Sequence, residues 1–190
     1  MKREEDPVVR YRVLPEEAFL APITGKGDLI IRTGIYLLLV TGSRAEHLTR
    51  IRDIQVTPDG ILILWGDRKV RERMSSYLTY HYEWSCRPPK DIANCLPHWI
   101  ERRERLTHSD SGRYVVAQRI NDLIGRIPGL KEAGLTSSFY RRRLSTLLGA
   151  SLGGRELTEL EFEMLMDHRM GTSLARYRLV GNPDELVVRQ

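Results

Sequence analysis

The spacing of apolar residues predicts two helices near the amino terminus. The segment LPEEAF, residues 14–19, begins the first helix, because Pro15 suits a first helical turn and the carboxylates of Glu16 and Glu17 interact favourably with the helix dipole there. The stretch DLIIRTGIYLLLV, residues 28–40, has helical periodicity and predicts the second.

A glycine and a capping pattern separate this second helix from a third. Gly42 is the kind of residue that ends a helix, since glycine adopts the left-handed conformation without a steric cost. Ser43 and Glu46 have the spacing of a capping box, in which each side chain bonds the backbone of the other residue. We therefore expect a helix through RAEHLTRI, residues 44–51, with Arg44 in its first turn.

The apolar period then changes to two, which predicts a three-stranded meander. Its strands are DIQVT (53–57), ILILW (61–65) and VRERMSSYL (70–78), with turns at PDG and GDRK between them. The second turn places Lys69 at or near its tip. The aromatic residues Tyr80, Tyr82 and Trp84 alternate in TYHYEW, a pattern more typical of sheet packing than of base stacking.

Helical periodicity returns after CRPP and continues to near the end of the chain. The predicted helices are residues 92–106, 113–127, 137–148 and 158–166, and a short one from residue 172. No repeat or long linker divides the chain. We expect an α+β fold, mostly helical with a small three-stranded antiparallel sheet, as one domain over residues 1–190 with its core at about 14–180.

Composition adds a preference for a polyanionic partner. The 190 residues include 41% hydrophobic ones, enough for one good core, and carry a net charge of +5. Of the 30 basic residues 25 are arginine, whose planar fork grips phosphate oxygens with two parallel hydrogen bonds, although a GC-rich genome produces the same bias.

Other classes of protein find little support. The apolar run 35–40 is far shorter than the roughly 18 residues of a membrane helix. The amino terminus is charged, so Cys86 and Cys95 are expected to be reduced thiols of a soluble, cytoplasmic protein. The histidines and cysteines have no zinc-binding spacing, and no metal or cofactor is expected.

Three short motifs, with the predicted turn at Lys69, follow one another in a suggestive order. TGSR ends at Arg44, SSFYRRRLSTLL contains Arg141, and DHRMGTSLARY places His168 nine residues before Tyr177. Each motif alone is common, but their order and their placement on predicted elements resemble the catalytic domain of the tyrosine recombinases, the phage-type integrase family. The resemblance covers roughly residues 14–180.

The resemblance implies a DNA strand transferase that works through a 3′-phosphotyrosyl intermediate. Tyr177 would be the nucleophile, and Lys69 the acid that protonates the leaving oxygen. Arg44, Arg141 and His168 would bind the non-bridging phosphate oxygens. Such an enzyme would bind double-stranded DNA and assemble with itself on paired DNA sites, at the nucleoid, in DNA recombination or integration, as the proteins of mobile elements do.

The sequence also departs from the family pattern. Ser138 stands where the family has a histidine, and is a possible substitute for it. His47 occupies the place of a usual carboxylate, and Asp67 replaces part of a glycine-lysine pattern. We expect no counterpart of the amino-terminal core-binding domain that larger recombinases carry. Three alternatives therefore stay open: a catalytically impaired DNA-binding relative, a type IB topoisomerase-like enzyme, and an unrelated helical interaction module.

Further arginines beside the motifs are candidate DNA contacts. Those adjacent to the predicted catalytic positions are Arg68, Arg142, Arg143, Arg169 and Arg176. Successive residues on a helix point in different directions, so the three arginines 141–143 cannot all serve the same phosphate.

Overall fold

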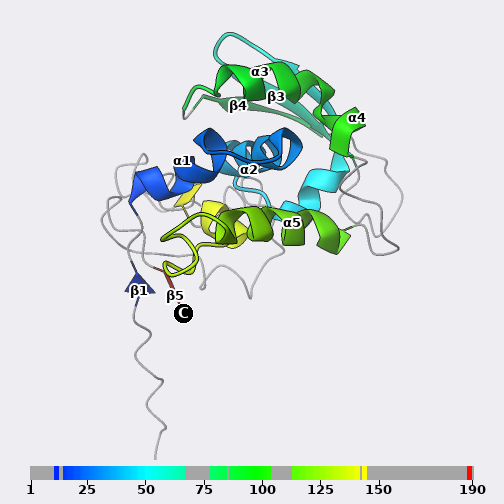
Figure 1. Cartoon of the computed structure of the whole chain (residues 1–190). Helices are drawn as coiled ribbons and strands as arrows, with labels where there is room; N and C mark the ends of the chain where they lie inside the picture. Colours follow the sequence, from blue (N-terminus) through cyan, green and yellow to red (C-terminus); the bar gives the residue numbers. More distant parts are fainter. Residues whose placement is uncertain are drawn as a thin grey trace, which may run out of the picture.

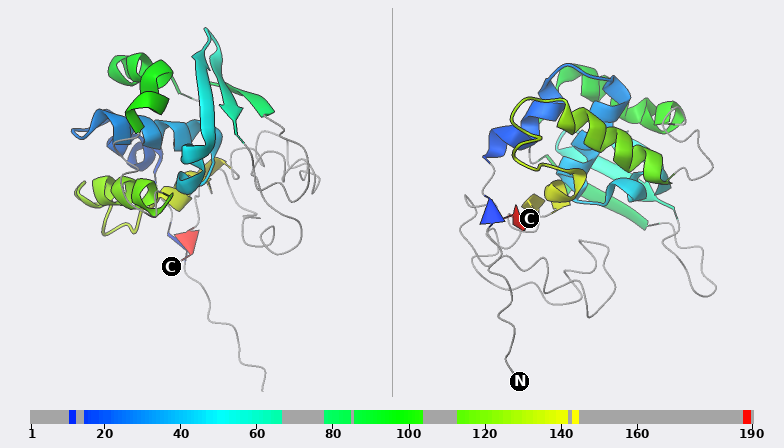
Figure 2. Two further views of the ribbon diagram at one scale, coloured as in Figure 1. Left: turned by 90° about the vertical axis from the view of Figure 1, so that its right-hand side faces the viewer. Right: turned by 60° about the horizontal axis from the view of Figure 1, so that its bottom comes forward.

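The computed structural model describes residues 11–12, 15–66, 78–84, 86–103, 113–141, 143–144 and 188–189. Within these ranges, helices stack in layers and a three-stranded antiparallel sheet stands along one side of them (Figures 1 and 2). This arrangement confirms the predicted mostly helical α+β fold.

The two amino-terminal helices are confirmed, and the second forms the centre of the molecule. Helix α1 spans Glu16–Thr24 and α2 spans Leu29–Thr41. The carboxylate of Asp28 caps α2 by accepting from the Ile30 amide over 2.8 Å. Ten of the 13 residues of α2 are buried, because α1, α3, α4 and α5 all pack around it.

Gly42 ends α2 as predicted, but the segment after it differs from the prediction. Residues Ala45–Arg50 form a 3₁₀ helix, η1, and Arg44 precedes it in an extended conformation (φ −76°, ψ 146°). Ser43 bonds to Thr41 at the end of α2 instead of to Glu46: its hydroxyl accepts from that of Thr41 over 3.0 Å and its amide donates to the same hydroxyl over 3.1 Å. The expected Ser43–Glu46 capping box is therefore wrong, as is the placement of Arg44 inside a first helical turn.

The sheet has the predicted order, and its third strand ends later than predicted. Strands β2 (Ile51–Val56), β3 (Gly60–Trp65) and β4 (Leu78–Glu83) pair antiparallel in that sequence. Of the predicted third strand, 70–78, residues 70–77 lie outside the described residues; Leu78 belongs to β4, which continues beyond the predicted end to Glu83.

The register places the alternating aromatic residues of β4 opposite the apolar residues of β3. Tyr80 and Tyr82 lie opposite Ile63 and Ile61, two fully buried residues of β3. The Tyr82 hydroxyl also accepts a hydrogen bond from Trp65 Nε1 over 3.1 Å. Tyr82 therefore packs in the sheet, as its alternation predicts.

A helical stretch covers one face of the sheet. It consists of α3 (Lys90–Cys95), the 3₁₀ turn η2 (Leu96–His98) and α4 (Trp99–Arg103), where one helix over 92–106 was predicted. Fully buried Trp99 donates from Nε1 to the Ile30 carbonyl over 3.0 Å, which ties this stretch to α2.

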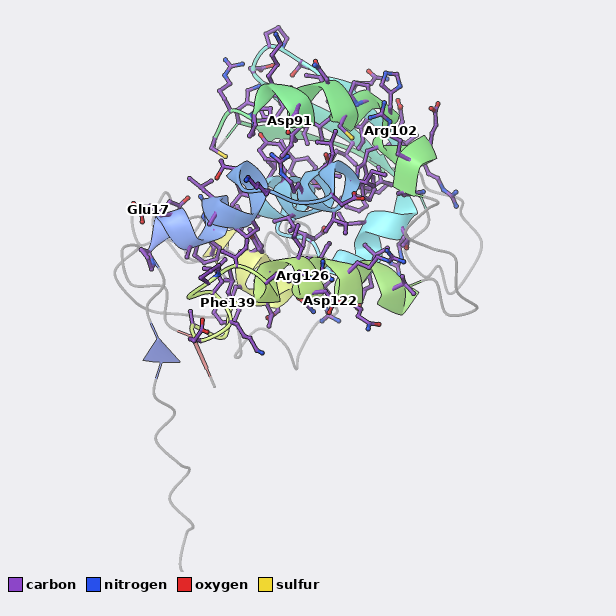
Figure 3. The ribbon with its side chains drawn as sticks, in the orientation of Figure 1. Glu17, Asp91, Arg102, Asp122, Arg126 and Phe139 are labelled. Carbon is purple, nitrogen blue, oxygen red and sulfur yellow. The ribbon has the colours of Figure 1, made fainter. Side chains whose placement is uncertain are left out.

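Helix α5 (Arg113–Gly125) lies on the opposite side of α2 (Figure 1). Its apolar side packs inward through Val116, Ile120 and Ile124, while Asp122 and Arg126 point outward (Figure 3). After α5, residues 137–141 and 143–144 are helical and are called the 137–144 helix below. The predicted continuation to 148, and the helices at 158–166 and from 172, lie outside the described residues.

The two ends of the described chain pair with each other. Strand β1 (Tyr11–Arg12) runs antiparallel to β5 (Val188–Arg189). No sequence pattern predicts this contact, since two residues are too few to show a period.

Candidate active site

Arg141 reaches the junction between α2 and η1, where Arg44 lies. The Arg141 residue is only 2% exposed, and its Nη1 donates to the Gly42 carbonyl over 3.3 Å. Gly42 adopts φ of 60° and turns the chain at the end of α2. Arg44 lies two residues beyond this turn. Two arginines far apart in the sequence therefore come to the same turn of the backbone.

Close packing fixes this approach. A Cβ atom built on Gly42 would collide with the Leu144 side chain of the 137–144 helix, and would lie 3.1 Å from Leu144 Cβ. Gly42 thus serves two purposes: its positive φ ends α2, and its missing side chain lets the helix with Arg141 come close.

Arg44 is the exposed member of the pair. Its side chain is 44% exposed, and its Nη1 lies 3.7 Å from a carboxylate oxygen of Glu46. An ion pair this open to water is weak and easily exchanged for another anion. The buried guanidinium of Arg141 is held in place, whereas that of Arg44 is accessible.

Ser138 lies one helical turn before Arg141. It is exposed, and its hydroxyl is 2.9 Å from that of Thr136. The amide of Ser137 donates to Asn121 of α5 over 2.8 Å, which anchors the start of the 137–144 helix. A small hydroxyl therefore stands in the position where the family pattern has a larger imidazole.

Arg143 points into the protein. Its Nε lies 3.0 and 2.9 Å from the two carboxylate oxygens of Glu16, its Nη2 also bonds Glu16, and its side chain is 5% exposed. A DNA contact by Arg143 would require this pair to open, so we leave Arg143 out of the proposed DNA contacts. Sequence reasoning missed the pair because its members are 127 residues apart.

The remaining predicted site residues lie outside the described residues. They are the catalytic candidates Lys69, His168 and Tyr177 and the DNA-binding candidates Arg68, Arg142, Arg169 and Arg176. Of the five predicted catalytic residues, Arg44 and Arg141 are the two whose placement the structure describes.

Two buried tyrosines are poor nucleophiles. Burial raises the pKa of Tyr36 and of Tyr140 well above the ordinary value for a phenol. Each hydroxyl donates to a backbone carbonyl, that of Cys86 over 2.7 Å and that of Phe19 over 2.9 Å. Both phenols therefore remain protonated and engaged in the fold.

The cysteines and the other potential metal ligands can be described within the same ranges. Cys86 and Cys95 are both free, and burial raises the pKa of the Cys86 thiol. No group of three metal-binding side chains occurs among the described residues. No helix in the same residues has the length and apolar character needed to cross a membrane.

Comparison with known proteins gives a match at the level of structure. No protein-family model and no curated protein matches the sequence. The crystal structure of XerA recombinase superposes with a TM-score of 0.57 and 14% identity, covering 96% of this chain and 64% of XerA. A XerH site-specific recombinase bound to its difH substrate in a pre-cleavage complex gives a TM-score of 0.48, with 18% identity over 87% of this chain and 49% of XerH.

The likeness to XerA recombinase extends over nearly all of this chain. The chain spans somewhat less than two thirds of the length of XerA. The chain therefore shares the fold of XerA recombinase, and its motifs resemble those of the tyrosine recombinase family.

Proposed function

We propose that the chain is a tyrosine-type DNA strand transferase, a site-specific recombinase that cleaves and rejoins DNA. The observation that carries the proposal is the hydrogen bond from Arg141 to the Gly42 carbonyl, two residues before Arg44. It supports the idea that Arg44 of the TGSR motif and Arg141 of the SSFYRRRLSTLL motif bind the same phosphate. The recombinase fold supports the same reaction class.

The two arginines suit different parts of phosphate binding. Arg141 is buried and anchored, so it would offer a preorganised donor to the charge that develops in the transition state. Arg44 is exposed and only loosely paired with Glu46, so it could leave this carboxylate for a DNA phosphate. Together they would neutralise the non-bridging oxygens by charge-assisted hydrogen bonds.

The proposed cleavage breaks one phosphorus–oxygen bond and forms another. The Tyr177 oxygen would attack the phosphorus and lose its proton to water, while the bond to the 5′-oxygen of the next nucleotide breaks. Lys69 would protonate that leaving oxygen. The product is a 3′-phosphotyrosyl link with a free 5′-hydroxyl, and attack by a 5′-hydroxyl of a second strand reverses the step. We further propose that the chain works as an oligomer on paired DNA sites.

A nicked DNA site tests the proposal. Cleavage next to a nick releases a short oligonucleotide, so that the enzyme stays attached to the 3′ end and runs as an adduct on a denaturing gel. We expect the adduct with the full chain and with Tyr82→Phe, and none with Tyr177→Phe. Binding to the site without any adduct would reject the proposal.

Ser138 favours one alternative, a DNA-binding relative that has lost cleavage. An exposed serine hydroxyl bonded to Thr136 is a weaker phosphate ligand than an imidazolium. If this alternative is correct, the chain binds DNA with an affinity that falls with salt, and Tyr177→Phe does not change that affinity. A type IB topoisomerase-like activity would instead relax supercoiled plasmid without a preferred site.

A further inference from the structure

We infer that Glu16 and Arg143 form a positioning pair that sets the orientation of Arg141. This inference rests on the proposed function, in which Arg141 binds the phosphate. It assigns Arg143 a task different from the DNA contact that its place in the arginine run indicates. It also gives Glu16, in the first turn of α1, a part in the reaction.

The pair is built to fix an orientation. Arg143 Nε lies between both carboxylate oxygens of Glu16, at 3.0 and 2.9 Å, and Nη2 bonds the same carboxylate. Multiple charge-assisted bonds to one carboxylate restrict rotation far more than a single contact. Because the Arg143 side chain is 5% exposed, the pair is largely shielded from water on the arginine's side.

A second contact holds the same face of the helix on α1. The Tyr140 hydroxyl donates to the Phe19 carbonyl over 2.9 Å, and the two rings meet edge to face at 5.5 Å. Arg143 also lies over the Phe19 ring, at 6.0 Å. Residues three apart share a helix face, so Tyr140 and Arg143 dock together on α1.

Arg141 projects from a different side of the helix. Successive residues are turned by about 100°, so a helix held on α1 by Tyr140 and Arg143 directs Arg141 elsewhere. That direction is toward Gly42, whose carbonyl accepts from Arg141. The contacts with α1 therefore set the rotation of the helix, and this rotation sets the position of the Arg141 guanidinium.

Helix α1 is itself held in place by α2. The guanidinium of Arg32, in α2, donates from Nε and Nη2 to the Ile23 carbonyl near the end of α1, over 2.9 and 2.6 Å. Arg32 also pairs with Asp91 of α3 at 2.7 Å. Since α2 ends at Gly42, the 137–144 helix is tied to α2 twice, directly by Arg141 and through α1 by Arg143.

Removing the charge of Glu16 distinguishes a positioning role of Arg143 from a direct DNA contact. If Arg143 contacted DNA, the Glu16 carboxylate would repel the phosphate, and Glu16→Gln would tighten binding. If the pair positions Arg141, Glu16→Gln and Arg143→Gln harm the site in the same way. Glu16→Gln is therefore expected to improve DNA binding if Arg143 contacts DNA, and to impair the site if the pair positions Arg141.

The experiment measures adduct formation at saturating nicked DNA, on a site that the full chain selects from a random pool. We expect Glu16→Gln and Arg143→Gln each to slow a single turnover by roughly tenfold to a hundredfold, because a displacement of about 1 Å has such an effect. The double substitution should be no slower than the slower single one. Glu17→Gln is the matched control, since Glu17 is exposed on α1 and makes none of the contacts above (Figure 3).

Arg143→Lys separates positioning from loss of folding. A lysine keeps the charge but bonds the carboxylate at one point, so we expect partial recovery of the rate over Arg143→Gln. The inference is overturned if Glu16→Gln leaves the rate unchanged or tightens DNA binding. It is also overturned if Arg143→Gln lowers the slope of affinity against salt by about one, the signature of a lost phosphate contact.

The proposed function can fail separately. If the unaltered chain binds DNA without forming an adduct, cleavage is rejected, and DNA affinity becomes the measure of the pair. We then expect Glu16→Gln and Arg143→Gln to weaken binding by the same factor, and to have no further effect when Arg141 is replaced by alanine. An effect that persists without Arg141 would overturn the inference.

Discussion

Arg141 donates a hydrogen bond to the carbonyl of Gly42 over 3.3 Å, across 99 positions of sequence. This contact joins the 137–144 helix, which carries Arg141, to the turn at Gly42 that precedes Arg44. It depends on a residue without a side chain, because Gly42 has φ of 60° and faces Leu144 at close range.

Gly42→Ala should destabilise the protein and disturb the site. A non-glycine residue in the left-handed region costs about 1–2 kcal/mol, and the collision with Leu144 adds to this. Urea unfolding measures the loss, and Gly125→Ala is the control, because a Cβ there meets nothing within 4 Å. Equal stability of the Gly42 variant and the unaltered chain would contradict the packing described at this turn.

Ser138→His should increase the rate of adduct formation. The residue is exposed, so an imidazole fits without repacking, and a preorganised donor in such a site is worth about a hundredfold to a thousandfold in rate. Single-turnover kinetics on nicked DNA measures the gain, with Ser138→Ala as the control for loss of the hydroxyl. If Ser138→His is no faster than Ser138→Ala, this position takes no part in phosphate binding.

Trp99→Phe should destabilise the fold more than Trp84→Phe. Trp99 Nε1 bonds the Ile30 carbonyl, so its loss removes a buried hydrogen bond worth about 0.5–1.5 kcal/mol, besides leaving a cavity. Trp84 Nε1 is buried and has no acceptor among the described residues, so its removal loses no such bond. Denaturant midpoints of the two variants compare them, and the reverse order would contradict this account.

The turn between β2 and β3 should contribute stability that depends on pH. A hydrogen bond from Thr57, above all, and the nearby His81 hold the pKa of Asp59 below its usual value. A lowered pKa stabilises the fold above the unfolded-state pKa, and this stability is lost as the pH falls through the folded-state value.

Asp59→Asn tests this contribution. The variant should be less stable than the unaltered chain at pH 7, and the difference should shrink below about pH 3.8, near the ordinary pKa of an aspartate. Urea midpoints across the acid range measure it. A difference that does not change with pH would mean that the Asp59 charge plays no part.

Local patterns were enough to predict much of the fold. Helix α2 and its end at Gly42 follow from a dense apolar run and a glycine, and strands β2 and β3 follow from alternation around the PDG turn. The end of the third strand was missed, because β4 continues past Leu78 to Glu83. This continuation depends on Tyr80 and Tyr82 pairing with β3, a contact that no local rule contains.

Motif order predicts Arg44 and Arg141 as site residues, but the surroundings of the predicted site depend on contacts between distant segments. The expected capping by Ser43 fails because Thr41 lies beside its hydroxyl. From the sequence alone, Arg143 resembles any other surface arginine. Its partner Glu16 is 127 positions away and is brought to it by the packing of α1. Such pairings follow from the assembled helices rather than from spacing along the chain.

The central claim is that Arg44 and Arg141 act on one phosphate, and a double-mutant cycle on adduct formation tests it most directly. Residues that act as a unit on one group are far from additive. We predict that Arg44→Ala and Arg141→Ala each slow the single-turnover rate at saturating nicked DNA by about a hundredfold or more. The double variant should lose much less than the product of the two factors. Independent, multiplying losses, or losses in DNA affinity alone, would contradict the claim.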